Sequence, residues 1–97
     1  MNKKIGVLDS GIGGTTVLNK IVELLPNEEY IYYADTKNNP YGEKSEEELY
    51  KIVKEIVTFL INKKNCKIIV LACNTATTKC MKKLQKEFPD MLFVGTV

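Results

Sequence analysis

The stretch that most constrains this chain is an apolar run that ends on a cysteine and passes directly into a helical pattern. Residues 68–72 are Ile-Ile-Val-Leu-Ala, which is typical of a buried strand, and Cys73 follows them. From Thr75 onward the pattern is helical, so Cys73 is expected at the carboxyl edge of a strand, beside a helix N-terminus. Ligands of open α/β sheets bind at that edge. The helix dipole and exposed N–H groups there favour a thiolate, which would make Cys73 a usable base or nucleophile.

Strands and helices alternate along the whole chain. Apolar residues at helical spacing separate the predicted strands, and Ser45 with Glu48 forms a capping-box pattern before the second helix. A turn-rich loop over residues 35–44 precedes that helix. The alternation predicts a flavodoxin-like, doubly wound parallel sheet of about four strands and three helices. The predicted strands are residues 4–8, 30–34, 68–72 and 92–97.

The size of the chain raises the question of whether this sheet is complete. Its 97 residues allow one domain. If the strand order is 2-1-3-4, the first helix covers one face and the other two helices cover the opposite face. One face is then under-covered, although apolar parallel strands are normally covered on both faces. We therefore expect residues 1–97 to be an incomplete half-module of a longer protein.

Composition and charge argue against several classes of protein. The formal net charge is only +2, and the lysines are spread along the chain, so a nucleic-acid-binding patch is not expected. No run approaches the roughly 18 apolar residues of a membrane span, and the first apolar segment is too short for a signal peptide. We expect a cytoplasmic protein that binds neither nucleic acid nor membrane. The sequence leaves the oligomeric state open, a homodimer included.

Three cysteines stand at seven-residue spacings, and the chain has no histidine. This pattern fits neither a disulfide framework nor a zinc site. Cys80 lies on the apolar stripe of a predicted helix and Cys66 stands just before a strand, so both are expected to be buried as small apolar residues. Cys73, with polar neighbours on its far side, is the functional candidate.

Polar residues follow three of the predicted strands. The first and third strands are neighbours in the expected order, so Asp9 and Ser10 should lie close to Cys73. Backbone N–H groups, hydroxyls and an amide beside a thiol suit a ligand carboxylate, whereas Asp9 suits an ammonium group or can orient the thiol. The three segments are Asp9-Ser10-Gly11, Asp35-Thr36 and Cys73-Asn74-Thr75.

Each of these features also has a plainer explanation. The glycines at 11, 13 and 14 fit a tight turn and close helix packing as well as they fit ligand binding. Asp9 is explained about equally well as a helix N-cap or turn residue. Asn39-Pro40-Tyr41-Gly42 alone is typical of a surface turn. The tyrosines at 30, 32 and 33 are expected to pack within their strand.

Three blocks, taken together and in this order, resemble the first half of glutamate racemase. They are Gly-Val-Leu-Asp-Ser-Gly-Ile-Gly-Gly at 6–14, Ala-Asp-Thr at 34–36 with Pro-Tyr-Gly-Glu-Lys-Ser at 40–45, and Ala-Cys-Asn-Thr-Ala at 72–76. The resemblance spans nearly the whole chain. It implies that residues 1–97 are the truncated N-terminal domain of a two-domain racemase, with the second domain absent. It also implies cofactor-independent interconversion of L- and D-glutamate, which supplies D-glutamate for peptidoglycan.

The resemblance implies a role for individual residues. The family uses two cysteines on opposite faces of the substrate α-carbon, and Cys73 corresponds to the one associated with the D-glutamate direction. Asp9 would assist it. The family's second cysteine lies in a later Cys-Thr-His motif that this chain does not contain, and Cys66 and Cys80 are in the wrong places to replace it. The substrate-binding residues implied are Asp9, Ser10, Tyr41, Gly42, Asn74 and Thr75.

Two alternatives to glutamate racemase remain open from the sequence. One is a racemase or isomerase acting on another small carboxylic acid. The other is a non-catalytic, flavodoxin-like module that binds phosphate or another anion, for which a reactive thiol has no purpose. A redox sensor fits less well, because no resolving cysteine lies at a usual spacing.

Overall fold

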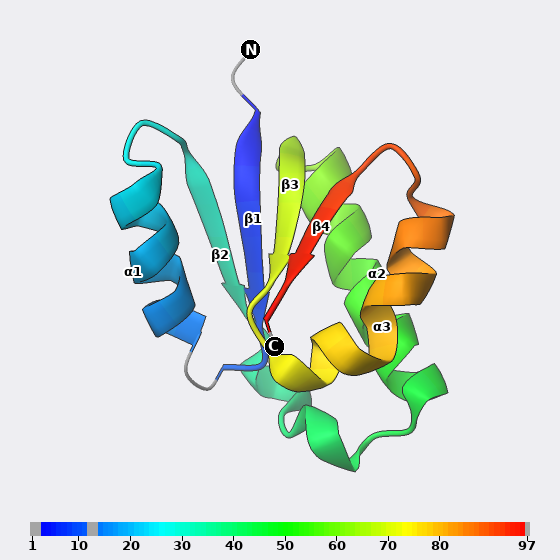
Figure 1. The fold of residues 1–97 in the computed structure, drawn as a ribbon. Coiled ribbons are helices and arrows are strands. Elements are labelled where there is room, and N and C mark those ends of the chain that lie inside the picture. The colour runs from blue at the N-terminus through cyan, green and yellow to red at the C-terminus, as the bar shows by residue number, and fades with distance from the viewer. Residues whose placement is uncertain (1–2, 12–13, 97) are drawn as a thin grey trace.

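The computed structural model describes residues 3–11 and 14–96. In this part of the chain, four strands form one sheet in which every pairing is parallel, in the order β2-β1-β3-β4 (Figure 1). The flavodoxin-like sheet predicted from the sequence is therefore confirmed, including its strand order. The strands are β1 (Lys4–Asp9), β2 (Tyr30–Ala34), β3 (Cys66–Leu71) and β4 (Leu92–Gly95).

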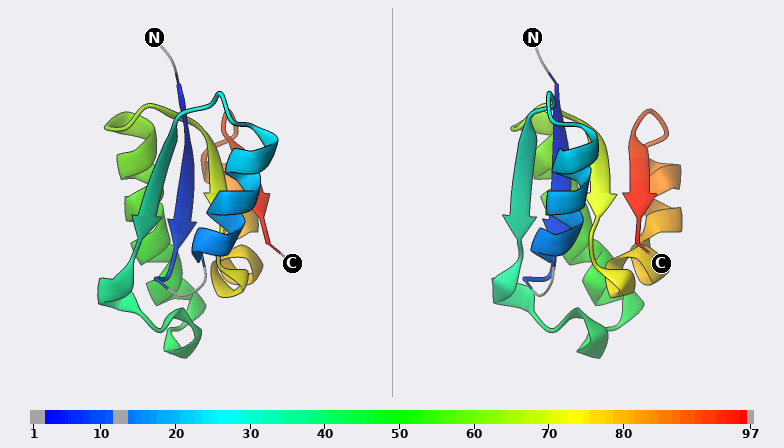
Figure 2. Two further views of the ribbon diagram at one scale, coloured as in Figure 1. Left: turned by 90° about the vertical axis from the view of Figure 1, so that its left-hand side faces the viewer. Right: turned by 60° about the vertical axis from the view of Figure 1, so that its left-hand side comes forward.

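Three helices in the described residues cover the sheet unequally. They are α1 (Gly14–Leu24), α2 (Glu46–Asn62) and α3 (Asn74–Glu87). The views in Figures 1 and 2 place α1 alone on one face and both α2 and α3 on the other. Two short 3₁₀ helices, Thr36–Asn38 and Tyr41–Glu43, lie in the loop for which the sequence predicts turns. The expected unequal distribution of helices is confirmed.

The main core lies between the sheet and the pair α2 and α3. Side chains of Leu8, Ile69 and Leu71 from the two central strands are fully buried there. The apolar stripes of α2 and α3 pack onto them because residues three or four apart share one face of a helix. Their buried members are Leu49, Val53, Ile56, Val57 and Leu60 of α2 and Ala76, Cys80 and Leu84 of α3.

The face that carries α1 has a smaller core and an open groove. Beneath α1, Ile5, Val7 and Val70 are buried. Next to α1 lies a groove of about 200 Å³ whose lining residues are all apolar. Leu24 is 79% exposed and Val94 is 45% exposed, so the under-covered face that the sequence predicts is present among the described residues. The lining residues of this groove, called the α1-side groove below, are Ile5, Ile21, Leu24, Leu25, Ile68, Val70 and Val94.

Several element boundaries differ from the prediction. The sequence predicts that Cys66 stands just before a strand. In the structure Cys66 is the first residue of β3, because it already pairs with Lys4 of β1. Helix α3 begins at Asn74 rather than Thr75, since Cys73 takes the extended backbone of an N-cap residue. Strand β4 ends at Gly95. Residues 12 and 13 of the glycine-rich turn predicted over residues 9–14, and the last predicted strand residue, Val97, lie outside the described residues.

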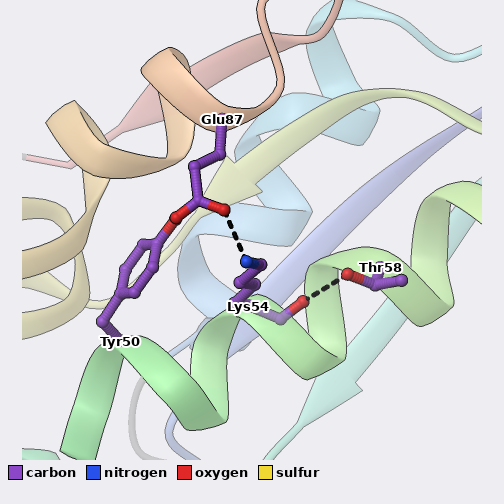
Figure 3. Close-up of polar contacts among 4 residues, drawn as sticks. All are labelled: Tyr50, Lys54, Thr58 and Glu87. Carbon is purple, nitrogen blue, oxygen red and sulfur yellow. Dashed lines mark hydrogen bonds and ion pairs between the residues drawn. The ribbon is translucent and has the colours of Figure 1, made fainter. Parts of the chain in front are cut away.

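Polar side chains cap the start of α2 and connect α2 to α3. The Glu48 backbone N–H donates to Ser45 Oγ over 3.2 Å, which confirms Ser45 as the N-cap. Further along α2, the Tyr50 hydroxyl donates to Glu87 Oε1 over 2.6 Å, and Lys54 Nζ lies 2.5 Å from Glu87 Oε2 (Figure 3). These contacts tie the middle of α2 to the end of α3.

Candidate active site

The carboxyl ends of β1, β2 and β3 meet at one edge of the sheet. Asp9 pairs with Ala34 across β1 and β2, and the Asp35 backbone N–H donates to the Asp9 carbonyl over 2.8 Å. On the other side of β1, the Ala72 N–H donates to the Leu8 carbonyl over 2.8 Å. The segments that follow these three strands therefore leave the sheet side by side, as the sequence predicts.

Asp9 is fully buried at the end of β1 and is held from two directions. Its Oδ2 accepts a hydrogen bond from the Gly11 backbone N–H over 3.1 Å and one from the Tyr32 hydroxyl over 3.0 Å. Gly11 has a φ of 103°, and a Cβ there would stand 2.6 Å from Thr36 Cγ2, so this turn requires glycine. Burial and the hydrogen bond to Asp9 raise the pKa of Tyr32.

Asp35 is the second buried carboxylate at this edge. Its Oδ2 accepts from the Tyr41 hydroxyl over 2.7 Å, and the Asn38 amide nitrogen lies 3.1 Å from both of its oxygens. Burial, and then the Asp35 carboxylate, raises the pKa of Tyr41; nearby Cys73 and Cys80 contribute in the same direction. The Tyr41 hydroxyl is thus held inside the protein by Asp35.

Cys73 differs from the other two thiols in its surroundings. It is half-buried at the junction of β3 and α3, and its carbonyl accepts from the Thr77 backbone N–H and hydroxyl, both over 3.0 Å. Cys66 and Cys80 are buried, and burial raises the pKa of both, to about 11 for Cys80. The prediction that Cys66 and Cys80 are core residues is confirmed.

The remaining candidate residues lie around this edge. Ser10 follows β1 and is 7% exposed, Asn74 and Gly42 are exposed, and Thr75 is half-buried in the first turn of α3. No atom lies within 4 Å of the place where a Cβ on Gly42 would stand, so its backbone is open to approach. These four residues therefore lie at the carboxyl edge of the sheet, in the segments that follow β1, β2 and β3.

Sequence reasoning missed three residues that shape the site. Tyr32 was expected only to pack, yet its hydroxyl reaches Asp9; the parallel register of β1 and β2 is the signal that could have indicated this contact. Asn38 supports Asp35 from within a loop, and a local Asx-type contact could have suggested it. Thr96 donates from its hydroxyl to Asn74 Oδ1 over 3.0 Å, which nothing in the sequence indicates.

The described part of the chain contains neither a candidate metal site nor a candidate membrane-spanning helix. No group of three or more His, Cys, Asp or Glu side chains there could hold a metal ion. Within the same residues, no helix is long and apolar enough to cross a membrane.

The chain is a parallel α/β domain with two buried carboxylates, a half-buried thiol and a helix N-terminus at the carboxyl edge of its sheet, which is the edge where open α/β sheets bind ligands. No family model matches the chain. Curated relatives do: the chain is 48% identical over 96 residues to the glutamate racemase of Lactobacillus johnsonii, covering 99% of this chain and 35% of that protein. It is 47% identical over 94 residues to the glutamate racemase of Clostridium perfringens, covering 97% and 36%.

Solved structures give the same result. The glutamate racemase of Escherichia coli in complex with L-glutamate and the activator UDP-MurNAc-Ala matches with a TM-score of 0.92 at 40% identity, covering 100% of this chain and 36% of that one. The Francisella tularensis enzyme in complex with D-glutamate matches with a TM-score of 0.87 at 36% identity, covering 97% and 35%. In sequence and in fold, the chain is therefore similar along its whole length to glutamate racemases, and it spans about a third of the length of the relatives it matches.

Proposed function

We propose that this chain is the first part of a longer glutamate racemase, which interconverts L- and D-glutamate without a cofactor. The observation that carries the proposal is Cys73, half-buried between β3 and α3 at the sheet edge where Asp9 also lies. Whole-length similarity to glutamate racemases supports the choice of substrate. The product D-glutamate would serve peptidoglycan synthesis, in the reducing environment of the cytoplasm.

The proposed chemistry is a proton transfer through two thiols. The Cys73 thiolate takes the α-proton of D-glutamate, so the Cα–H bond breaks and an S–H bond forms. A second cysteine, in the part of the longer protein beyond this chain, then gives its proton to the opposite face of the α-carbon. The α-proton of an amino acid is weakly acidic, so the intermediate carbanion requires fixed hydrogen-bond donors in a site shielded from water.

The remaining residues of the edge divide the binding of the substrate. Asp9 assists Cys73 and faces the ammonium group. Asn74 and Thr75 stand in the first turn of α3, where backbone N–H groups point toward a bound carboxylate. Ser10 and the backbone of Tyr41 and Gly42 complete the set, since the Tyr41 hydroxyl is held by Asp35.

The longer protein would also complete the fold. The α1-side groove is apolar and open, and sheets of parallel strands are normally covered on both faces. The relatives are nearly three times as long as the matched segment, so they contain enough chain to supply the cover. We expect residues 1–97 alone to show no useful racemisation, because they hold one of the two bases.

The test is exchange of the α-proton of each glutamate enantiomer in deuterated water, with the complete protein that contains this chain. Cys73→Ala should lower racemisation by about 10²–10⁴-fold. Cys80→Ala is the matched control: it removes a buried thiol of the core and should retain racemisation. Unchanged racemisation by Cys73→Ala would end the proposal, and a screen of other small carboxylic acids tests the choice of glutamate.

A further inference from the structure

We propose that Tyr32 is a positioning residue of the site, which acts by fixing the carboxylate of Asp9. This inference rests on the proposed function and extends it to a residue outside the strand-end motifs. Tyr32 stands in the middle of β2, three residues before Asp35, and its hydroxyl donates to Asp9 Oδ2 over 3.0 Å.

The geometry of the sheet explains how a mid-strand residue reaches the strand end. Tyr32 pairs with Val7, and Asp9 is the next residue of β1 on the same face, since side chains alternate along a strand. A tyrosine ring is long enough to extend along the face from one position to the next on the neighbouring strand.

The ring of Tyr32 is itself held in place by packing. It lies against the buried cluster of Ile5, Val7 and Val70 beneath α1. Packing therefore fixes the ring, and the ring fixes the direction from which its hydroxyl approaches the carboxylate. The pKa of Tyr32 is raised, so the hydroxyl keeps its proton and remains a donor.

The second donor to the same oxygen comes from a different element. The Gly11 backbone N–H approaches Asp9 Oδ2 from the turn after β1, over 3.1 Å, whereas Tyr32 approaches from β2. Two donors on separate elements restrict the rotation of the Asp9 side chain. The Gly11 N–H alone, from the turn that directly follows Asp9, would restrict it less. A buried carboxylate is stable only when such donors surround it. Removing the Tyr32 hydroxyl would leave Asp9 in place but less firmly oriented.

Tyr30 provides a closely matched control. It lies on the same strand and the same face, packs against the same cluster, and its hydroxyl donates to the carbonyl of Leu25, the residue that follows α1, over 2.6 Å. Tyr30→Phe and Tyr32→Phe each remove one hydroxyl from β2, together with its hydrogen bonding: to the Leu25 and Ile21 carbonyls for Tyr30, and to Asp9 for Tyr32. They differ in that only Tyr32→Phe removes a donor to Asp9.

The experiment measures kcat for glutamate racemisation and the thermal unfolding midpoint, in the complete protein, for a double-mutant cycle. Tyr32→Phe should lower kcat by about ten- to a hundredfold, the range expected when a reacting group is slightly misplaced. Tyr30→Phe should keep wild-type kcat. In an Asp9→Asn background, adding Tyr32→Phe should lower kcat no further, because the group through which Tyr32 acts has been replaced.

The outcomes separate the two proposals. An equal fall in kcat for Tyr30→Phe and Tyr32→Phe, or a full effect of Tyr32→Phe in the Asp9→Asn background, would show that Tyr32 is only structural. An active enzyme that is insensitive to Tyr32→Phe overturns the Tyr32 role and leaves the racemase intact. Absence of racemisation by the unmodified complete protein overturns the proposed function, and this role with it.

Discussion

At the scale of the residue, Gly95 is where close packing leaves no room for a side chain. It ends β4 directly against α3. A Cβ there would overlap the Thr77 methyl group and stand 2.8 Å from Met81 Sδ. The Thr77 hydroxyl accepts the Thr96 backbone N–H over 3.2 Å, and its own hydrogen lies between two acceptors, the Cys73 carbonyl at 3.0 Å and the Leu71 carbonyl at 3.2 Å. The approach of β4 to the start of α3 thus depends on one missing methyl group.

We predict that Gly95→Ala lowers the free energy of unfolding by about 1–3 kcal/mol, because the added methyl forces Thr77 or β4 to shift. Gly42→Ala is the control, since nothing lies within 4 Å of its Cβ position, and its cost should be within about 0.5 kcal/mol. Urea unfolding of both variants gives the comparison. Equal stability of the two variants would contradict the packing explanation.

At the scale of the element, α2 and α3 are joined by an apolar seam and by polar contacts around Tyr50, one of which places Lys83 Nζ 5.4 Å from the centroid of the Tyr50 ring. The seam consists of buried side chains of the main core, and the other polar contact is the pairing of Glu87 with Tyr50 and Lys54 (Figure 3). Hydrogen bonds from Lys54 and Tyr50 lower the pKa of Glu87 below its ordinary value of 4.5. Burial and the Glu87 carboxylate raise the pKa of Tyr50 in return.

This contact predicts a pH dependence. The pKa of Glu87 is lower in the folded chain than in the unfolded one, so its stabilising effect is complete above about pH 4.5 and is lost as the pH falls through the folded-state pKa. The difference in unfolding free energy between wild type and Glu87→Gln should therefore be constant near neutral pH and shrink in acid. Glu55→Gln, at an exposed position of α2, is the control. A difference that grows in acid would contradict this assignment.

At the scale of the whole molecule, the two faces of the sheet differ in how well they are covered. One face is buried by two helices, and the other has α1 and the α1-side groove beside it. Leu92 and Val94 of the edge strand β4 are 57% and 45% exposed. Together with the α1-side groove, they leave this face of the sheet with apolar surface in contact with solvent.

We predict that the longer protein buries Val94. In residues 1–97 alone, Val94→Thr should change the free energy of unfolding by less than about 0.5 kcal/mol, because the added hydroxyl faces solvent. In the complete protein the same hydroxyl would be buried, and the cost should rise to about 1–3 kcal/mol. Val22→Thr, at a 38% exposed valine of α1 outside the groove, should cost the same in both. Equal costs at Val94 in both proteins would refute the cover.

The sequence by itself determined the elements, their order and the edge at which the candidate residues gather. Periodicity of the apolar residues specifies each helix and strand, and a parallel sheet sends its carboxyl ends to one side. This was enough to predict Asp9, Ser10, Asp35 and Cys73 at the same edge, and Cys66 and Cys80 in the core.

Only the tertiary structure decided which polar groups meet. Tyr32 reaches Asp9 because β1 and β2 pair in one register, and Thr96 reaches Asn74 because β4 ends beside α3. The Tyr41 hydroxyl reaches Asp35 because the loop that follows β2 brings position 41 back to the residue at its own start. These contacts join residues 22 or more positions apart, or depend on how a loop closes, and neither periodicity nor local propensity encodes such distances.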